Sequence, residues 1–299
     1  GEEVGCISCH SEHDGYPHPE NPAEDIRDYV LGYRDTCKKC HDDLCEEHTD
    51  CVHNVALDAG NRNAAICADC HTPHSQGRVT DDEGNLLRTI KREIPPTCAK
   101  CHNAIFEEYS QSVHGAGLFG GNPDVPTCID CHQLHVIVNP EEPSFRLDSV
   151  HYCSKCHTDK DLMKKYDIST NVESTYIADF HGTTITLFEY DDPNEPTNKP
   201  VCFDCHGYHD VLSADDPEKG IHVKSNLLMT CQRCHPDAEE NFPESWLSHY
   251  IPDTENYPLV FYVKLFYKFF IPTVLGGMGV FVVSDIYKRF LRRKDDTII

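Results

Sequence analysis

Basic residues are scarce in this chain of 299 residues, which has 26 Lys and Arg against 50 Asp and Glu and a formal net charge of -24. The imbalance lies before residue 257, because the segment from Tyr257 onward has seven basic and three acidic residues, while residues 1–256 have 19 and 47. A surface of this sign repels a phosphate backbone. Nucleic acid is therefore excluded as a partner.

Apolar residues are also few. Hydrophobic types make up 39% of the chain, which contains 19 prolines and has a mean hydropathy of -0.51. This composition does not provide an ordinary aliphatic core, so a folded domain of this kind needs other apolar material to bury.

Cysteine, in contrast, is abundant and regularly placed. Sixteen of the 18 cysteines form eight Cys-x-x-Cys pairs, and a histidine directly follows each pair. The motifs are Cys6/Cys9/His10, Cys37/Cys40/His41, Cys67/Cys70/His71, Cys98/Cys101/His102, Cys128/Cys131/His132, Cys153/Cys156/His157, Cys202/Cys205/His206 and Cys231/Cys234/His235. Two thiols at this spacing can bond to both vinyl groups of one porphyrin, with the next histidine under the iron. The sequence therefore predicts eight covalently attached haem c groups.

Zinc is the main alternative cofactor, since paired Cys-x-x-Cys motifs also form tetrahedral zinc sites. A zinc site does not require the trailing histidine, which all eight motifs have. We set zinc aside. With about 32 residues for each haem before residue 257, porphyrin faces replace much of the aliphatic core. We expect a mostly irregular and α-helical multihaem cytochrome c fold, with short helices and loops around a row of haems and very little β structure.

One apolar segment is long enough to cross a membrane. Residues 259–283 are apolar except for Lys264 and Lys268, and 25 helical residues span about 37 Å. Five basic residues follow between 288 and 294. By the positive-inside rule they are cytoplasmic, which predicts a single-pass membrane protein with its haem domain on the periplasmic or cell-surface side. The alternative is a buried helix of a soluble protein. Haem c is attached after export, so we interpret Gly1 as a processed N-terminus.

The chain also repeats itself. An offset of 61 aligns residues 36–41 with 97–102 and residues 67–74 with 128–135, and a looser third copy spans 153–209. These copies predict three two-haem modules with one further haem on either side. The predicted divisions are 1–35 for the first haem, 36–96, 97–150 and 151–220 for modules A, B and C, 221–256 for the eighth haem, 257–287 for the membrane helix and 288–299 for the basic tail.

The same repeat indicates which histidines bind the opposite face of each iron. Twelve histidines remain after the proximal ones, and eight are needed if every iron has two histidine ligands. A residue kept in each copy of a haem module most simply serves its haem, which selects His53, His114, His181, His74, His135 and His209. His13 extends the Cys-His-x-x-His pattern to the first haem. For the eighth haem we choose His249 over His222.

Cys45 and Cys51 lie outside the motifs. They are close in sequence and belong to an oxidising compartment, so we expect a disulfide between them. A thiolate ligand to haem is the weaker alternative.

The C-terminal third of the chain resembles a known family. The matching stretches are Phe180-His181-Gly182, residues 202–210, residues 230–236 and residues 263–267 with Ile271-Pro272. They are similar to membrane-anchored multihaem cytochromes found with cytochrome b type or other quinone-linked membrane subunits. The resemblance implies electron exchange between the membrane quinone pool and redox partners outside the cytoplasm.

Three functional classes bind this many haems. An electron-transfer cytochrome needs fully ligated irons, and the histidines suffice for that. Extracellular cytochrome filaments are also repeat-built, which leaves a homo-oligomer or conductive filament as the alternative. Octahaem reductases and oxidases need one open iron, often marked by a lysine in place of the proximal histidine. No Cys-x-x-Cys-Lys occurs here. We expect an electron-transfer protein without catalytic residues.

Truncation before Tyr257 tests the single anchor. The shortened chain should leave the membrane as a soluble, red protein that carries all its haems, because every attachment motif lies upstream. Fractionation of cells that express both forms measures this. Membrane association of the truncated chain would contradict the predicted topology.

Overall fold

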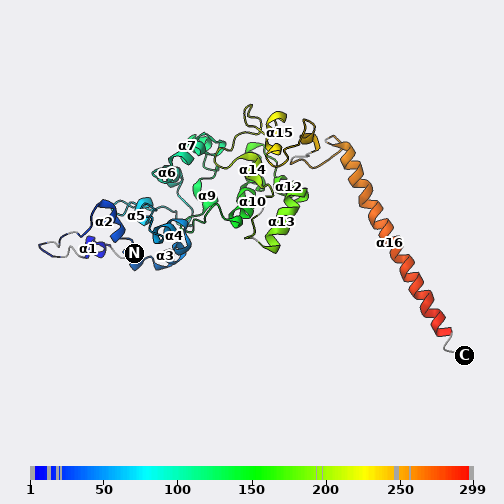
Figure 1. Ribbon diagram of the computed structural model, residues 1–299, viewed down its shortest axis with the longest axis horizontal. Helices are drawn as coiled ribbons and strands as arrows, with labels where there is room; N and C mark the ends of the chain where they lie inside the picture. Colours follow the sequence, from blue (N-terminus) through cyan, green and yellow to red (C-terminus); the bar gives the residue numbers. More distant parts are fainter. Residues whose placement is uncertain are drawn as a thin grey trace. The chain divides into compact units, whose positions relative to one another are not determined.

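The computed structural model describes residues 4–11, 15–17, 20, 22–192, 194–196, 198–245, 249–255 and 257–295. These residues form helices and irregular loops (Figure 1), with one isolated β-bridge between Thr80 and Leu86 and no strand. The prediction of a helical and irregular fold with very little β structure is confirmed. The chain divides into two compact units, Gly1–Pro243 and Glu244–Ile299.

Most helices are short. In chain order they are α1 (Cys6–Cys9), α2 (Ile26–Gly32), η2 (Cys37–Lys39), α3 (Asp42–Glu47), η3 (His48–Asp50), α4 (Val52–Asp58), α5 (Cys67–Cys70), α6 (Arg88–Ala99), α7 (Asn103–Gln111), α8 (Val113–Phe119), α9 (Cys128–His132), α10 (Pro143–His157), α11 (Lys160–Met163), η4 (Lys164–Tyr166), α12 (Val172–Ala178), α13 (Phe180–Asp191), α14 (Cys202–His206), α15 (Lys224–Gln232), η5 (Phe242–Ser245) and α16 (Pro258–Asp295). Every Cys-x-x-Cys pair begins on a helical turn. Residues three apart on such a turn lie on one side of it, so both thiols face the same way.

An aspartate closes the turn of the second motif in each module. The backbone N–H that precedes the first cysteine donates to this carboxylate, from Ile66 to Asp69 at 2.8 Å and from Thr127 to Asp130 at 2.6 Å. Val201 donates to Asp204 at 2.6 Å in the same way. A carboxylate at the third helical position caps an exposed N-terminus. This local need explains why Cys-x-Asp-Cys recurs in all three copies.

A pair of helices packs closely in modules B and C, α7 with α8 and α12 with α13. A tyrosine hydroxyl fixes each pair to the loop before the second motif, from Tyr109 to the Pro126 carbonyl at 2.7 Å and from Tyr176 to the Pro200 carbonyl at 2.8 Å. The residue after the repeated histidine is a glycine. A Cβ at Gly115 would lie 1.9 Å from the Tyr109 carbonyl oxygen.

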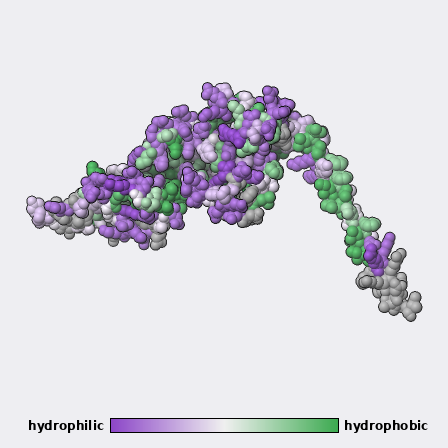
Figure 2. Space-filling view, viewed as in Figure 1, coloured by the Kyte–Doolittle hydropathy of each residue, from purple (hydrophilic) through white to green (hydrophobic). Residues whose placement is uncertain are grey.

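Buried apolar side chains are few, as the composition indicated. One cluster joins the end of module B to module C and consists of Leu147, Val150, Tyr176, Ile185 and Val201. The visible face of the first unit is mostly hydrophilic (Figure 2). Hydrogen bonds, helix caps and backbone contacts therefore position much of the described part of this unit.

Two backbone hydrogen bonds join consecutive modules. The Val52 N–H, at the start of α4, donates to the Ile137 carbonyl at 2.8 Å, and the Val113 N–H, at the start of α8, donates to the Val211 carbonyl at 2.9 Å. Val52 and Val113 are equivalent in the repeat, and each acceptor lies two residues after a Cys-His-x-x-His histidine of the next module.

The second unit contains the long helix α16. Its segment Pro258–Arg289 has 32 residues and contains an 18-residue stretch with a mean hydropathy of 1.8, and its apolar side chains are exposed along the helix (Figure 2). The helix is long and apolar enough to cross a membrane. The prediction of one apolar C-terminal helix is confirmed.

Replacement of Gly115 by alanine tests the close helix pair. The added Cβ would overlap a backbone carbonyl that no side-chain rotation can move, so we expect a loss of about 2 kcal/mol or more in unfolding free energy. Thermal unfolding of the full chain in detergent measures this. Gly77 is the control, because a Cβ there meets nothing within 4 Å. Equal melting temperatures for the two variants would contradict the packing.

Candidate functional site

Among the described residues, six motif histidines each face a second histidine ring. In each of these pairs one ring belongs to a Cys-x-x-Cys-His motif and the other is a histidine that the repeat selected. The ring centroids are 5.9 Å apart for His10 and His74, 6.1 Å for His102 and His53, 6.1 Å for His71 and His135, 6.1 Å for His132 and His209, 6.4 Å for His157 and His114, and 6.3 Å for His235 and His181.

This separation has a chemical meaning. An imidazole nitrogen lies about 1.1 Å from its ring centroid and binds a metal at about 2.0 Å, so two imidazoles on opposite sides of one metal ion have centroids about 6 Å apart. All six pairs have this spacing. Each pair supplies two protein ligands, and the described residues contain no group of three or more His, Cys, Asp or Glu side chains that could hold a metal ion by themselves.

The environment keeps several of these rings neutral. Burial, and then the neighbouring His157, lower the pKa of His114 to about 4. Burial also lowers the pKa of His157, and burial followed by the nearby His209 and His102 lowers the pKa of His132. Neutral imidazole is the form that binds a metal. These pairs are therefore in the metal-binding state at neutral pH.

An oxygen lies beside Nδ1 of two other rings. Nδ1 of His71 is hydrogen-bonded to Gln76 Oε1 at 3.3 Å, and because this oxygen accepts only, Nδ1 is the donor. Nδ1 of His181 lies 3.3 Å from Asp179 Oδ2. A supporting oxygen at one ring nitrogen is the usual arrangement of a metal-binding imidazole.

The thiols of the two motifs in one module lie side by side. In module B a hydrogen bond joins Cys98 to Cys128, which lowers the pKa of Cys98 to about 7 and raises that of Cys128. In module C a hydrogen bond between the Cys202 and Cys153 thiols lowers the pKa of Cys202 and raises that of Cys153. In module A, burial and then the charge and hydrogen bond of Cys37 raise the pKa of Cys67.

Thiols of consecutive modules are also close enough to interact electrostatically. Burial is the main cause that raises the pKa of Cys70, and Cys98 adds to it. Burial, then the adjacent Asp130 and then Cys156, raise the pKa of Cys131 to about 11. The pKa of Cys205 rises to about 11 through burial, Asp204 and then Cys231. The second to eighth motifs thus form a continuous series of neighbours.

Five predicted haem-binding cysteines are not among these neighbouring thiols, and all five are exposed, namely Cys6, Cys9, Cys40, Cys101 and Cys234. Cys40 and Cys101 are each the second cysteine of the first motif in their module, while the equivalent residue of module C, Cys156, is partly buried. As for the other motif cysteines, their bonds to a porphyrin stay a prediction.

Two arginines hold the second motif of a module in place, and the sequence analysis did not find them. Arg146, near the end of module B, donates to Asp204 of module C at 2.6 Å and to the Lys199 carbonyl at 2.7 Å, and its guanidinium lies 5.3 Å from the Phe203 ring centroid. Arg27, in the segment of the first haem motif, binds both carboxylate oxygens of Asp69 of module A at 2.9 Å. The sequence feature that could have indicated these arginines is the capping aspartate, because its carboxylate can also accept hydrogen bonds from a cationic side chain.

The facing histidines of two motifs stay predictions, those of His41 and His206. His13 lies outside the described residues, and the ring that faces His10 is His74. His235 faces His181. His249 belongs to the second unit, and its role as a ligand stays a prediction.

The predicted disulfide falls partly outside the described part of the structure. The side chain of Cys45 is not described, while Cys51 is buried, with its Sγ 4.0 Å from His53 Nδ1. The pairing of the two cysteines stays a prediction. The contact with Cys51 is the main cause that raises the pKa of His53.

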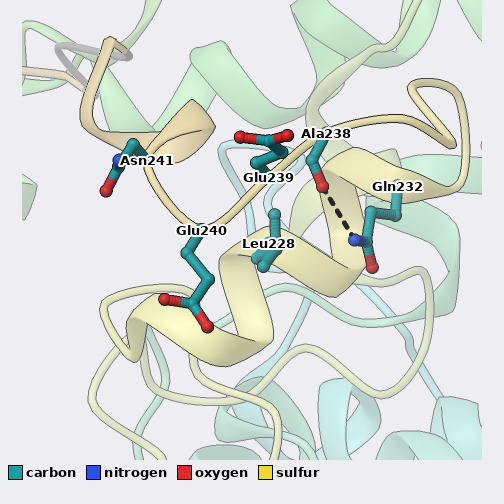
Figure 3. A pocket seen from close by; sticks show the side chains of 6 residues that line it. All are labelled: Leu228, Gln232, Ala238, Glu239, Glu240 and Asn241. Carbon is teal, nitrogen blue, oxygen red and sulfur yellow. Dashed lines mark hydrogen bonds between the residues drawn. The ribbon is translucent and has the colours of Figure 1, made fainter.

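A shallow hollow of about 430 Å³ lies beside the eighth motif, between α15 and the loop that follows it (Figure 3). Gln232 spans it by donating to the Ala238 carbonyl at 2.9 Å. The lining includes Glu239 and Glu240 but no histidine or cysteine. It forms an acidic surface next to this motif.

No family model matches the chain, and no solved structure matches it.

Replacement of Arg146 by alanine tests the arginine contact. The variant removes two hydrogen bonds and leaves a partly buried carboxylate, so we expect a loss of about 1–3 kcal/mol in unfolding free energy. Arg78→Ala is the control, because the Arg78–Asp82 pair is exposed, with side-chain exposures of 61% and 87%, and exposed pairs contribute about 0–1 kcal/mol. Guanidinium unfolding compares the two. A loss that is no larger for Arg146 would contradict its role.

Proposed function

We propose that this chain is a membrane-anchored octahaem c-type cytochrome that transfers electrons. The observation that carries the proposal is the set of six histidine pairs, each with one ring directly after a Cys-x-x-Cys turn and a spacing that suits one metal ion between the rings. The cysteines of each motif would hold the porphyrin covalently. Its proximal histidine and the facing histidine would bind the iron from the two sides.

The ligand set favours electron transfer over catalysis. A bound haem supplies an iron that accepts and releases one electron. At each of the six pairs, both histidines would bind the iron, which would leave no place on it for a substrate. Burial lowers the pKa of His114 to about 4 and so keeps this ring neutral. A carboxylate oxygen of Asp179 lies 3.3 Å from Nδ1 of His181, and supporting groups of this kind would tune a bound iron.

The arrangement of the motifs supports a conducting row. Thiols of the second to eighth motifs are neighbours in chain order, so the attached haems would be neighbours as well. The apolar helix α16 would anchor the row to a membrane, with the basic tail in the cytoplasm and the haems outside it. Quinone-linked membrane subunits or other cytochromes would then be the electron donors and acceptors, as the sequence resemblance implies.

Haem content and the ligand role of His114 test the function together. The intact mass of the purified chain should correspond to eight attached haems, and the oxidised protein should be low-spin. His114→Met should change one haem, with a raised potential or a high-spin signal, while haem attachment stays complete.

The control for this variant is His18→Ala, at a position that the repeat does not select. It should leave the spectrum and the redox titration unchanged. An intact mass that corresponds to fewer than eight attached haems would contradict the cofactor assignment. An unchanged redox titration of His114→Met would remove that residue from the ligand set.

A further inference from the structure

The facing histidines do not belong to the nearest motif, and their offsets follow a rule. The first class consists of the Cys-His-x-x-His histidines. His74 follows the third motif but faces His10 of the first. His135 follows the fifth motif and faces His71 of the third. His209 follows the seventh motif and faces His132 of the fifth, so the partner in all three cases is two motifs upstream.

The second class lies between the two motifs of a module and points in the opposite direction. His53 lies in module A and faces His102, in the first motif of module B. His114 lies in module B and faces His157, in the first motif of module C. His181 lies in module C and faces His235 of the eighth motif. Each of these histidines skips one motif and pairs with the next.

Two backbone hydrogen bonds independently bring the same modules together. Val52 precedes His53, and its N–H binds the Ile137 carbonyl, two residues after His135. Val113 precedes His114, and its N–H binds the Val211 carbonyl, two residues after His209. Each hydrogen bond therefore connects the backbone next to a histidine of the second class with the backbone near a histidine of the first class, across the boundary between two modules. These hydrogen bonds involve no histidine side chain.

Local ligation is sterically unfavourable. If His74 served the motif that it follows, it would bind the same iron as His71 from the opposite face of the porphyrin. Three residues reach about 10 Å at most when fully extended, and this length would have to pass around the porphyrin edge.

We infer that the six haems of these pairs are ligated across modules in this fixed order, so that the segment holding a haem by its thiols and the segment that supplies its second histidine belong to different parts of the repeat. The inference rests on the proposed haem binding. Each of these six haems would link two segments, one through the thioether bonds and the proximal histidine and the other through the facing histidine. Haem binding would therefore hold the modules together.

A double-mutant experiment on the full chain in detergent tests the order. In the otherwise unchanged chain, His74→Met should alter one of the eight haems, seen as a change in its potential and spin state. In a background that lacks the first haem, Cys6→Ala with Cys9→Ala, His74→Met should alter none of the remaining seven. The iron that His74 serves is absent from that background.

His135→Met is the matched control, since its inferred iron, on His71, is present in both backgrounds and should change in both. A change caused by His74→Met among the seven remaining haems would overturn the inference. If His74→Met had no effect in the unaltered chain, its ligand role would be wrong, and a chain without haem would contradict the proposed function itself.

The opposite end of the row provides a second test if the first background does not fold. His181→Met should alter one haem in the full chain and none after Cys231→Ala with Cys234→Ala. An effect that persists in this background would overturn the inference for the second class of histidines.

Discussion

An iron with two imidazole ligands needs one from each face of the porphyrin, and the Cys-x-x-Cys-His turn can supply only one of them. The second ligand has to come from elsewhere, which makes every such centre a long-range contact. In the histidine pairs for which we propose this role, the sequence separation of the two rings ranges from 43 residues, between His114 and His157, to 77 residues, between His132 and His209. The loops and short helices of the first unit can be understood as the structure that delivers those second rings.

The protein part accomplishes this with little apolar material. Aspartates close the turns of the second motifs, two of them with an arginine bound to the same carboxylate. Tyr109 and Tyr176 fix the helix pairs, and glycines after the repeated histidines let the backbones approach closely. These are local and directional interactions. They hold the motifs and helices in position in a unit whose hydrophobic cluster is small.

The sequence was sufficient for the element types and for most of the histidines. Eight Cys-x-x-Cys-His motifs, few apolar residues and one apolar run predict a helical, irregular unit and a C-terminal helix. The repeat selected His53, His74, His114, His135, His181 and His209, and all of these face a motif histidine. It could not assign partners, because an offset of 61 shows which residues are equivalent and not which are adjacent in space. For the same reason it could not show that Cys40 and Cys101 are exposed while the equivalent Cys156 is partly buried. Arg27 and Arg146 were missed because single arginines have no motif.

The crossed order of the histidines also limits how such a protein can change in length. A duplicated or deleted segment with two motifs and both classes of histidine leaves every other pair in its order. If the proposed haems are bound, loss of a single motif would remove one haem and leave the histidine that faces it without an iron. Under this arrangement, descendants of the gene would gain or lose haems in twos, and the number of haems would stay even.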